Sequence, residues 1–110
     1  MISRSSENIQ RRDIVVFRYP GDQSQVFVKR VVGLPGEVVA IHEGRVFIDQ
    51  KPIEESYLNG KLNSLSRTFS EYRVPPQSYY VLGDNRDASN DSRIWGALSA
   101  DMIYGRVIFK

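Results

Sequence analysis

Residues 25–36 read Gln-Val-Phe-Val-Lys-Arg-Val-Val-Gly-Leu-Pro-Gly, and this stretch decides how the chain folds. Its first eight residues are rich in valine and contain only two charges, a pattern typical of a β-strand. The following Gly33–Gly36 ends the strand, because glycine and proline favour turns. Alternate residues of a strand share a face, so Lys29 should lie on the same face as Phe27 and Val31.

Short apolar runs separated by turn residues extend this pattern along the chain. We expect further strands at Ile14–Phe17, Glu37–Ile41, Arg45–Ile48, Tyr79–Leu82 and Ile103–Phe109. Residues 59–70 are polar and predict a loop, and residues 1–10 predict a flexible lead-in to a single β-rich domain over residues 11–110. No window has sustained helical periodicity. The fold class predicted is therefore all-β, with coiled antiparallel sheets that form a partly open barrel and little helix.

The composition of the 110 residues excludes several classes of function. The 15 Lys and Arg are interspersed with 13 Asp and Glu, and the net charge of +2 predicts no nucleic-acid partner. There is no cysteine, so disulfides and thiolate metal sites are excluded, and His42 is the single histidine. No metal or cofactor is implied. No apolar run approaches the roughly 18 residues of a membrane span, so we expect these residues to be soluble.

Lys29 is the first candidate for chemistry, because its expected neighbours on the strand face are apolar. Burial disfavours the ammonium form of lysine and lowers its pKa, which would let the neutral amine act as a general base. The alternative is a solvated surface charge whose stem lies along apolar neighbours.

The second candidate is the polar stretch Gly83–Arg93, which reads GDNRDASNDSR and follows an apolar strand. It fits a surface turn in which side chains bond their own backbone. It also fits a network in which carboxylates pair with arginines and hold a hydroxyl in place. A calcium loop is a poorer fit, because Ser92 stands where the glycine of that motif belongs and Leu98 where its bidentate glutamate belongs.

Three motifs in order resemble those of the type I signal peptidase (leader peptidase) family. Residues 12–17, RDIVVF, resemble the family box RGDIVVF, and residues 29–37, KRVVGLPGE, resemble KRVVGLPGD. Residues 83–96 match the box GDNRxxSxDSRxxG at every fixed position. The resemblance spans residues 11–110, with Arg12 and Glu37 as departures from the usual Gly and Asp.

This resemblance implies a serine endopeptidase with a Ser–Lys dyad that removes signal peptides from exported pre-proteins. Lys29 matches the general base, and Ser89 matches the serine that orients it. The residues that match the supporting network are Asp84, Asn85, Arg86, Asp91, Ser92 and Arg93. The residues that match the lining of the pockets for small side chains, one and three positions before the cut, are Val16, Val26, Phe27 and Val28. The family binds its substrate as an extended strand.

The family's nucleophilic serine lies in a Ser-Met-x-Pro motif that precedes the first of these boxes, and no such motif stands in residues 1–12. We therefore expect this chain alone to be inactive. The parent protein would be anchored in the cytoplasmic membrane, with this domain on the extracytoplasmic face. Two alternatives stay open: a non-catalytic relative that binds extended peptides during assembly of secreted or surface polymers, and a cytosolic Ser–Lys autoprotease of the repressor type.

Overall fold

A computed structural model describes residues 2–3 and 8–108 of the chain, which form two antiparallel sheets. In spatial order, the first sheet consists of β1 (Ile2–Ser3), β10 (Ile103–Val107), β2 (Ile14–Tyr19), β3 (Asp22–Gly33), β8 (Ser78–Leu82) and β9 (Leu98–Ser99). The second sheet consists of β6 (Lys51–Pro52), β5 (Arg45–Ile48), β4 (Val38–His42) and β7 (Phe69–Arg73). The helices are α1 (Ser92–Trp95) and two 3₁₀ turns, η1 (Gly60–Leu62) and η2 (Ala100–Met102).

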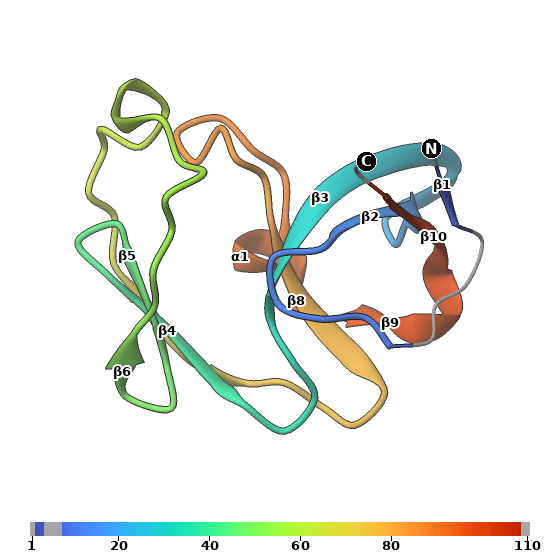
Figure 1. The fold of residues 1–110 in the computed structure, drawn as a ribbon, viewed down its shortest axis with the longest axis horizontal. Coiled ribbons are helices and arrows are strands. Elements are labelled where there is room, and N and C mark those ends of the chain that lie inside the picture. The colour runs from blue at the N-terminus through green and yellow to red at the C-terminus, as the bar shows by residue number, and fades with distance from the viewer. Residues whose placement is uncertain (1, 4–7, 109–110) are drawn as a thin grey trace.

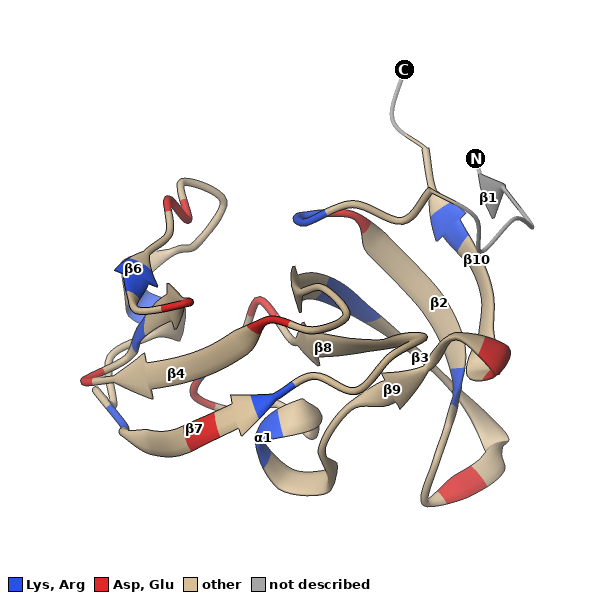
Figure 2. Cartoon of the chain, turned by 90° about the horizontal axis from the view of Figure 1, so that it is seen from below, with Lys and Arg blue, Asp and Glu red and all other residues tan. Residues whose placement is uncertain are grey.

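The larger sheet curls into a half-barrel, and the smaller sheet lies beside it (Figure 1). The chain passes from one sheet to the other after β3 and returns before β8. Strands with almost no helix confirm the fold class expected from the sequence. Basic and acidic residues are distributed over both sheets (Figure 2), as the interspersed charges of the sequence indicated.

β3 changes its environment along its length. Residues 22–26 are exposed, whereas Val31 and Val32 at its other end are fully buried. Val31 packs into a core with Phe17 of the half-barrel, and Val32 packs into a second core with Val39 and other residues of the smaller sheet. The strand is therefore covered on both faces where the two sheets meet, which explains its consecutive valines.

The hairpin of β4 and β5 forms across Glu43 and Gly44, as predicted, and both residues have positive φ angles of 49° and 81°. A turn with two positive φ angles matches the twist of the strands it joins. Val39, Ile41, Val46 and Ile48 of this hairpin point into the second core. The alternation of apolar and polar residues thus fixed both its register and its buried face.

The structure differs from the sequence-based expectation at several places. β3 begins at Asp22, three residues before the expected start, and the strand expected over residues 103–109 is described as β10 to Val107, with residue 109 outside the described residues. β7 begins at Phe69, inside the stretch expected to be a loop, and its pairing with β4 contains an irregularity. At the N-terminus, Ile2–Ser3 pair with β10 and Ile9 is buried in the half-barrel core, within the expected flexible lead-in. The other residues of the lead-in, 1 and 4–7, lie outside the described residues.

Candidate active site

Lys29 and Ser89, sixty residues apart in the sequence, meet at the surface of the half-barrel. The ammonium nitrogen Nζ of Lys29 on β3 donates to Oγ of Ser89 at 3.0 Å. The same Nζ lies 5.3 Å from the centre of the Phe27 ring, so the two side chains share a face of the strand as predicted. Ser89 lies in the polar loop that connects β8 to α1.

Partial burial lowers the pKa of Lys29 below its ordinary value. The nearby carboxylate of Asp91 opposes this shift, and the guanidinium of Arg93 adds to it. This direction is the one expected for a lysine among apolar neighbours. A larger fraction of neutral amine at neutral pH is what a general base requires.

Asp91 and Arg93 form a buried ion pair behind Ser89. Nε and Nη2 of Arg93 donate to the two carboxylate oxygens of Asp91 at 2.9 and 2.8 Å. The Asp91 side chain is fully buried and also accepts from the amide of Gly83 at 3.0 Å. Burial by itself would raise the pKa of Asp91, but hydrogen bonds from Arg93, Gly83 and Ser89, together with the charge of Arg93, hold it below the usual range. Asp91 therefore stays ionised and fixes the loop that carries Ser89.

Gly83 leaves the space that the contact between Lys29 and Ser89 requires. A Cβ atom at this position would lie 2.0 Å from Oγ of Ser89 and 3.3 Å from Nζ of Lys29. The close approach of the polar loop to β3 thus depends on the absence of a side chain here.

Two more ion pairs hold the polar loop. Arg30, the residue after Lys29, donates to both oxygens of Asp84 at 2.9 and 2.8 Å. Arg86 is buried and binds both oxygens of Glu55, which follows β6. The sequence indicated carboxylate partners for Arg86 and Arg93 within the loop, but Arg86 takes its partner from another segment. None of the three motifs includes Glu55, and nothing in the sequence distinguished it from its neighbour Glu54.

The other residues predicted for the network have different environments. Ser92 is buried, and its Oγ accepts from the amide of Val81 on β8 at 2.9 Å. Asn85 is exposed and contributes its carbonyl oxygen to a turn with Ala88. Asp91 also caps α1, because its carboxylate accepts from the amide of Arg93.

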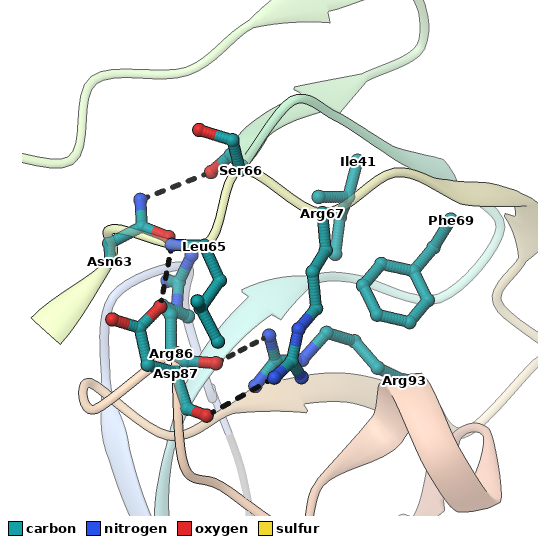
Figure 3. A pocket seen from close by; sticks show the side chains of 10 residues that line it. Ile41, Asn63, Leu65, Ser66, Arg67, Phe69, Arg86, Asp87 and Arg93 are labelled. Atoms are coloured by element: carbon teal, nitrogen blue, oxygen red, sulfur yellow. Dashed lines mark hydrogen bonds between the residues drawn. The ribbon is translucent and has the colours of Figure 1, made fainter.

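A second loop, residues 62–67, lies against the outer side of the polar loop, where a small pocket separates the two (Figure 3). The carboxylate of Asp87 accepts from the amides of Ser64 and Leu65 at 2.9 and 3.1 Å and from the hydroxyl of Ser64 at 2.7 Å. Arg93 and Arg67 donate to the successive carbonyl oxygens of Arg86 and Asp87. Asp87 thus ties the second loop to the loop of Ser89.

Three of the four predicted pocket residues lie together. Val16 and Val28 are paired across β2 and β3, and Val16 and Val26 line an apolar hollow that also includes Tyr104. Val26 and Val28 are 60% and 55% exposed. Phe27 does not join them: its ring stacks on Tyr19 at 4.5 Å and packs against the half-barrel core on the other face. Alternation along the strand accounts for this difference, since Phe27 stands between two valines.

None of the helices in residues 2–3 and 8–108 is long and apolar enough to cross a membrane. Within the same residues, no group of three or more His, Asp or Glu side chains could hold a metal ion.

Comparison with known proteins assigns the chain to a family. A model of the family described as "Signal peptidase, peptidase S26" matches residues 1–110. The chain belongs to the signal peptidase S26 family. This confirms the family that the three motifs indicated.

Individual members of the signal peptidase family agree with this assignment. A probable signal peptidase I-1 from Synechocystis sp. is 38% identical over 105 residues, which cover 89% of this chain and 52% of that protein. A signal peptidase I from Bacillus caldolyticus is 36% identical over 113 residues, which cover 93% of this chain and 61% of that protein. The chain thus spans between half and two thirds of the length of these relatives.

A solved structure resembles most of the chain. The crystal structure of a signal peptidase I from Enterococcus faecalis V583 superposes with a TM-score of 0.79 at 30% sequence identity. The match covers 94% of this chain and 100% of the crystallised chain. The half-barrel is therefore the fold of a signal peptidase I.

Proposed function

We propose that this chain is the part of a type I signal peptidase that carries the general base, Lys29, and the serine that orients it, Ser89. The observation that carries the proposal is the 3.0 Å contact between these two side chains in a member of the signal peptidase family. The hydroxyl of Ser89 accepts from Nζ and also supports Asp91, so it holds the amine in place. In the complete enzyme, the amine takes the proton of a nucleophilic serine as that serine attacks the scissile carbonyl.

The nucleophile of this mechanism comes from a Ser-Met-x-Pro segment, and residues 1–12 hold no such motif. We infer that the chain by itself does not hydrolyse peptides, although it keeps the base and part of the substrate groove. The parent protein would be anchored in the cytoplasmic membrane and would act on pre-proteins at its extracytoplasmic face.

The substrate would bind as an extended strand along β3. Residues 22–29 of this strand have β2 on one side, and the pairing of β3 with β8 on the other side begins only at Arg30. Exposed Val26 and Val28 stand along this part of β3, and the apolar hollow at Val16 and Val26 suits small aliphatic side chains. A strand edge with pockets for alternate side chains is a usual way to recognise extended peptides. This supports cleavage after small residues one and three positions before the cut.

The experiment joins the chain to an upstream segment that contains the Ser-Met-x-Pro motif of a relative and measures cleavage of a pre-protein. We expect the chain alone to be inactive and the joined protein to be active. Lys29→Ala should then lower the cleavage rate by about 10²- to 10⁴-fold, which is the usual contribution of a general base. Lys51→Ala removes an exposed lysine far along the chain and is the matched control. Cleavage at the wild-type rate by the Lys29→Ala protein would show that the base is another group.

A further inference from the structure

Glu55 joins the smaller sheet to the loop that carries Ser89. Its two carboxylate oxygens accept from Nη2 and Nη1 of Arg86 at 2.5 and 3.3 Å. Both side chains are buried, with 9% of Glu55 and 3% of Arg86 exposed. Lys29 donates to Ser89 rather than to Glu55, and none of the three family boxes includes Glu55. The three motifs therefore do not account for the ion pair between Glu55 and Arg86.

Arg86 connects Glu55 to the backbone that lies beside Lys29 and Ser89. Its Nε donates to the carbonyl oxygen of Gly83 at 3.0 Å in a buried environment. Gly83 has no side chain and thereby leaves the space that Ser89 and Lys29 occupy. A displacement of Arg86 would thus move the backbone against which both reactive groups pack.

Tyr57 makes a second connection from the same segment. Its hydroxyl donates to Glu55 at 2.5 Å, and its ring lies 4.1 Å from the guanidinium carbon of Arg30. Arg30 follows Lys29 on β3 and binds Asp84, which follows Gly83. Burial, and then the hydrogen bond to Glu55, raise the pKa of Tyr57, so its hydroxyl stays protonated and able to donate. The segment thus holds the strand of Lys29 and the loop of Ser89 at once.

We propose that Glu55, supported by Tyr57, is a positioning residue for the pair formed by Lys29 and Ser89. This proposal rests on the proposed function of Lys29 as the general base. Glu55 acts through Arg86 and Gly83, and it keeps the loop close enough to β3 for Lys29 to stay partly buried. The connection that follows β6 thereby influences the protonation state of a lysine on the larger sheet.

The direction in which the pKa of Lys29 changes when Glu55 is replaced distinguishes a positioning role of Glu55 from other roles. If Glu55 positions the loop, its loss should let water reach Lys29 and raise the pKa of the amine, because burial is the main cause that lowers it. If Glu55 acted only through its charge, removing a negative charge would lower the pKa of Lys29 further. If Glu55 served only the stability of the fold, the pKa of Lys29 in the folded protein would not change.

The pKa can be measured in this chain as it stands, without a nucleophile. Trace acetylation with a limiting amount of acetic anhydride, followed by peptide mass spectrometry across a pH series, reports the fraction of neutral amine at each lysine. Lys51 and Lys61 are exposed and serve as internal references. In Glu55→Gln, we expect the labelling of Lys29 relative to Lys51 at neutral pH to fall about three- to tenfold, because a higher pKa leaves a smaller fraction of neutral amine.

The matched control is Glu37→Gln. Glu37 forms a similar two-oxygen ion pair with Arg11, at 2.7 and 2.8 Å, on another part of the molecule. This variant should lose stability and leave the labelling of Lys29 unchanged. Tyr57→Phe keeps the ring on Arg30 and removes only the hydroxyl, so it gives a folded second variant, with a smaller fall in labelling, if Glu55→Gln unfolds.

The outcomes distinguish this inference from the proposed function. An ordinary pKa for Lys29 in the wild-type chain would contradict the general-base role itself. A low wild-type pKa that stays unchanged, or falls, in both Glu55→Gln and Tyr57→Phe would overturn the positioning role alone. An equal change in Glu37→Gln would also overturn it, because the effect would then follow from general loss of stability.

Discussion

The inner and outer sides of the loop over residues 83–93 are held in different ways. On the inner side, Asp91 and Arg93 form a buried ion pair, and Arg86 forms another with Glu55. On the outer side, Asp87 holds the neighbouring loop through hydrogen bonds from the amides of residues 64 and 65 and the hydroxyl of residue 64. Removing one partner of a buried ion pair lowers the free energy of unfolding far more than removing one partner of a surface pair does. The position of Ser89 should therefore depend on the inner side.

The largest loss of stability should come from removing one charge of the buried Asp91–Arg93 pair on the inner side. Asp91→Asn leaves the guanidinium of Arg93 without its anion and weakens the acceptor for the amide of Gly83. We expect the free energy of unfolding to fall by about 3–5 kcal/mol, as for other buried pairs that lose one partner. Urea denaturation followed by circular dichroism measures this change. A loss below about 1 kcal/mol, the usual range of surface pairs, would show that the inner side is not special.

A smaller but more localised effect should follow from Gly83→Ala. The added methyl group would meet Oγ of Ser89 at 2.0 Å, so the loop must move away from β3. Overpacking of this kind usually costs about 1–3 kcal/mol of stability. The joined enzyme should lose most of its cleavage activity. Gly60→Ala is the matched control, because a Cβ there meets nothing within 4 Å. Full activity of Gly83→Ala would contradict the close contact.

Replacing Lys29 by an uncharged residue of similar length should increase stability. The pKa of Lys29 is lower in the folded chain than its ordinary value of 10.5, so the unfolded chain binds this proton more tightly. The stability of the wild type should therefore rise as the pH rises through the folded pKa toward 10.5. Lys29→Met should be more stable at neutral pH by about 1 kcal/mol, a common gain when a functional group is removed. Urea denaturation across a pH series would contradict this if the gain did not shrink at alkaline pH.

The smallest effect should come from the outer side. Asp87→Asn keeps the shape of the side chain and removes the charge that the amides of Ser64 and Leu65 bind. Global stability should hardly change, because the group lies at the surface. Hydrogen exchange of these two amides should become faster, while the labelling of Lys29 should stay as in the wild type. A change at Lys29 equal to that of Glu55→Gln would remove the distinction between the two sides.

The sequence predicted the strands well where alternation or apolar runs reached the core, as in the hairpin of β4 and β5. It missed β7, because Phe69 and Tyr72 face the core three residues apart rather than two or four. The irregular pairing with β4 between these residues allows that spacing, and alternation cannot reveal it. The apolar pattern thus missed a strand whose core-facing residues depart from alternation.

The candidate site was predictable only in part. Lys29 stood out by its apolar neighbours, but only the resemblance to a family joined it to Ser89. Glu55 and Tyr57 carried no signal, because their roles depend on contacts with Arg86 and Arg30 from distant segments. Long-range pairs of this kind are set by how the two sheets pack together, and no local pattern records them.

The uneven pairing of β3 also defines a register. A chain that added itself to the open edge along residues 22–29 would have to leave this edge at Arg30, where β8 takes over the hydrogen bonds. Lys29 is the last residue before that point. The C-terminal end of β8, at Leu82, would thus fix the position at which an added strand must stop, so that the same peptide bond of any extended segment lies beside the amine. A one-residue change in where β8 ends would then shift the bond that is presented.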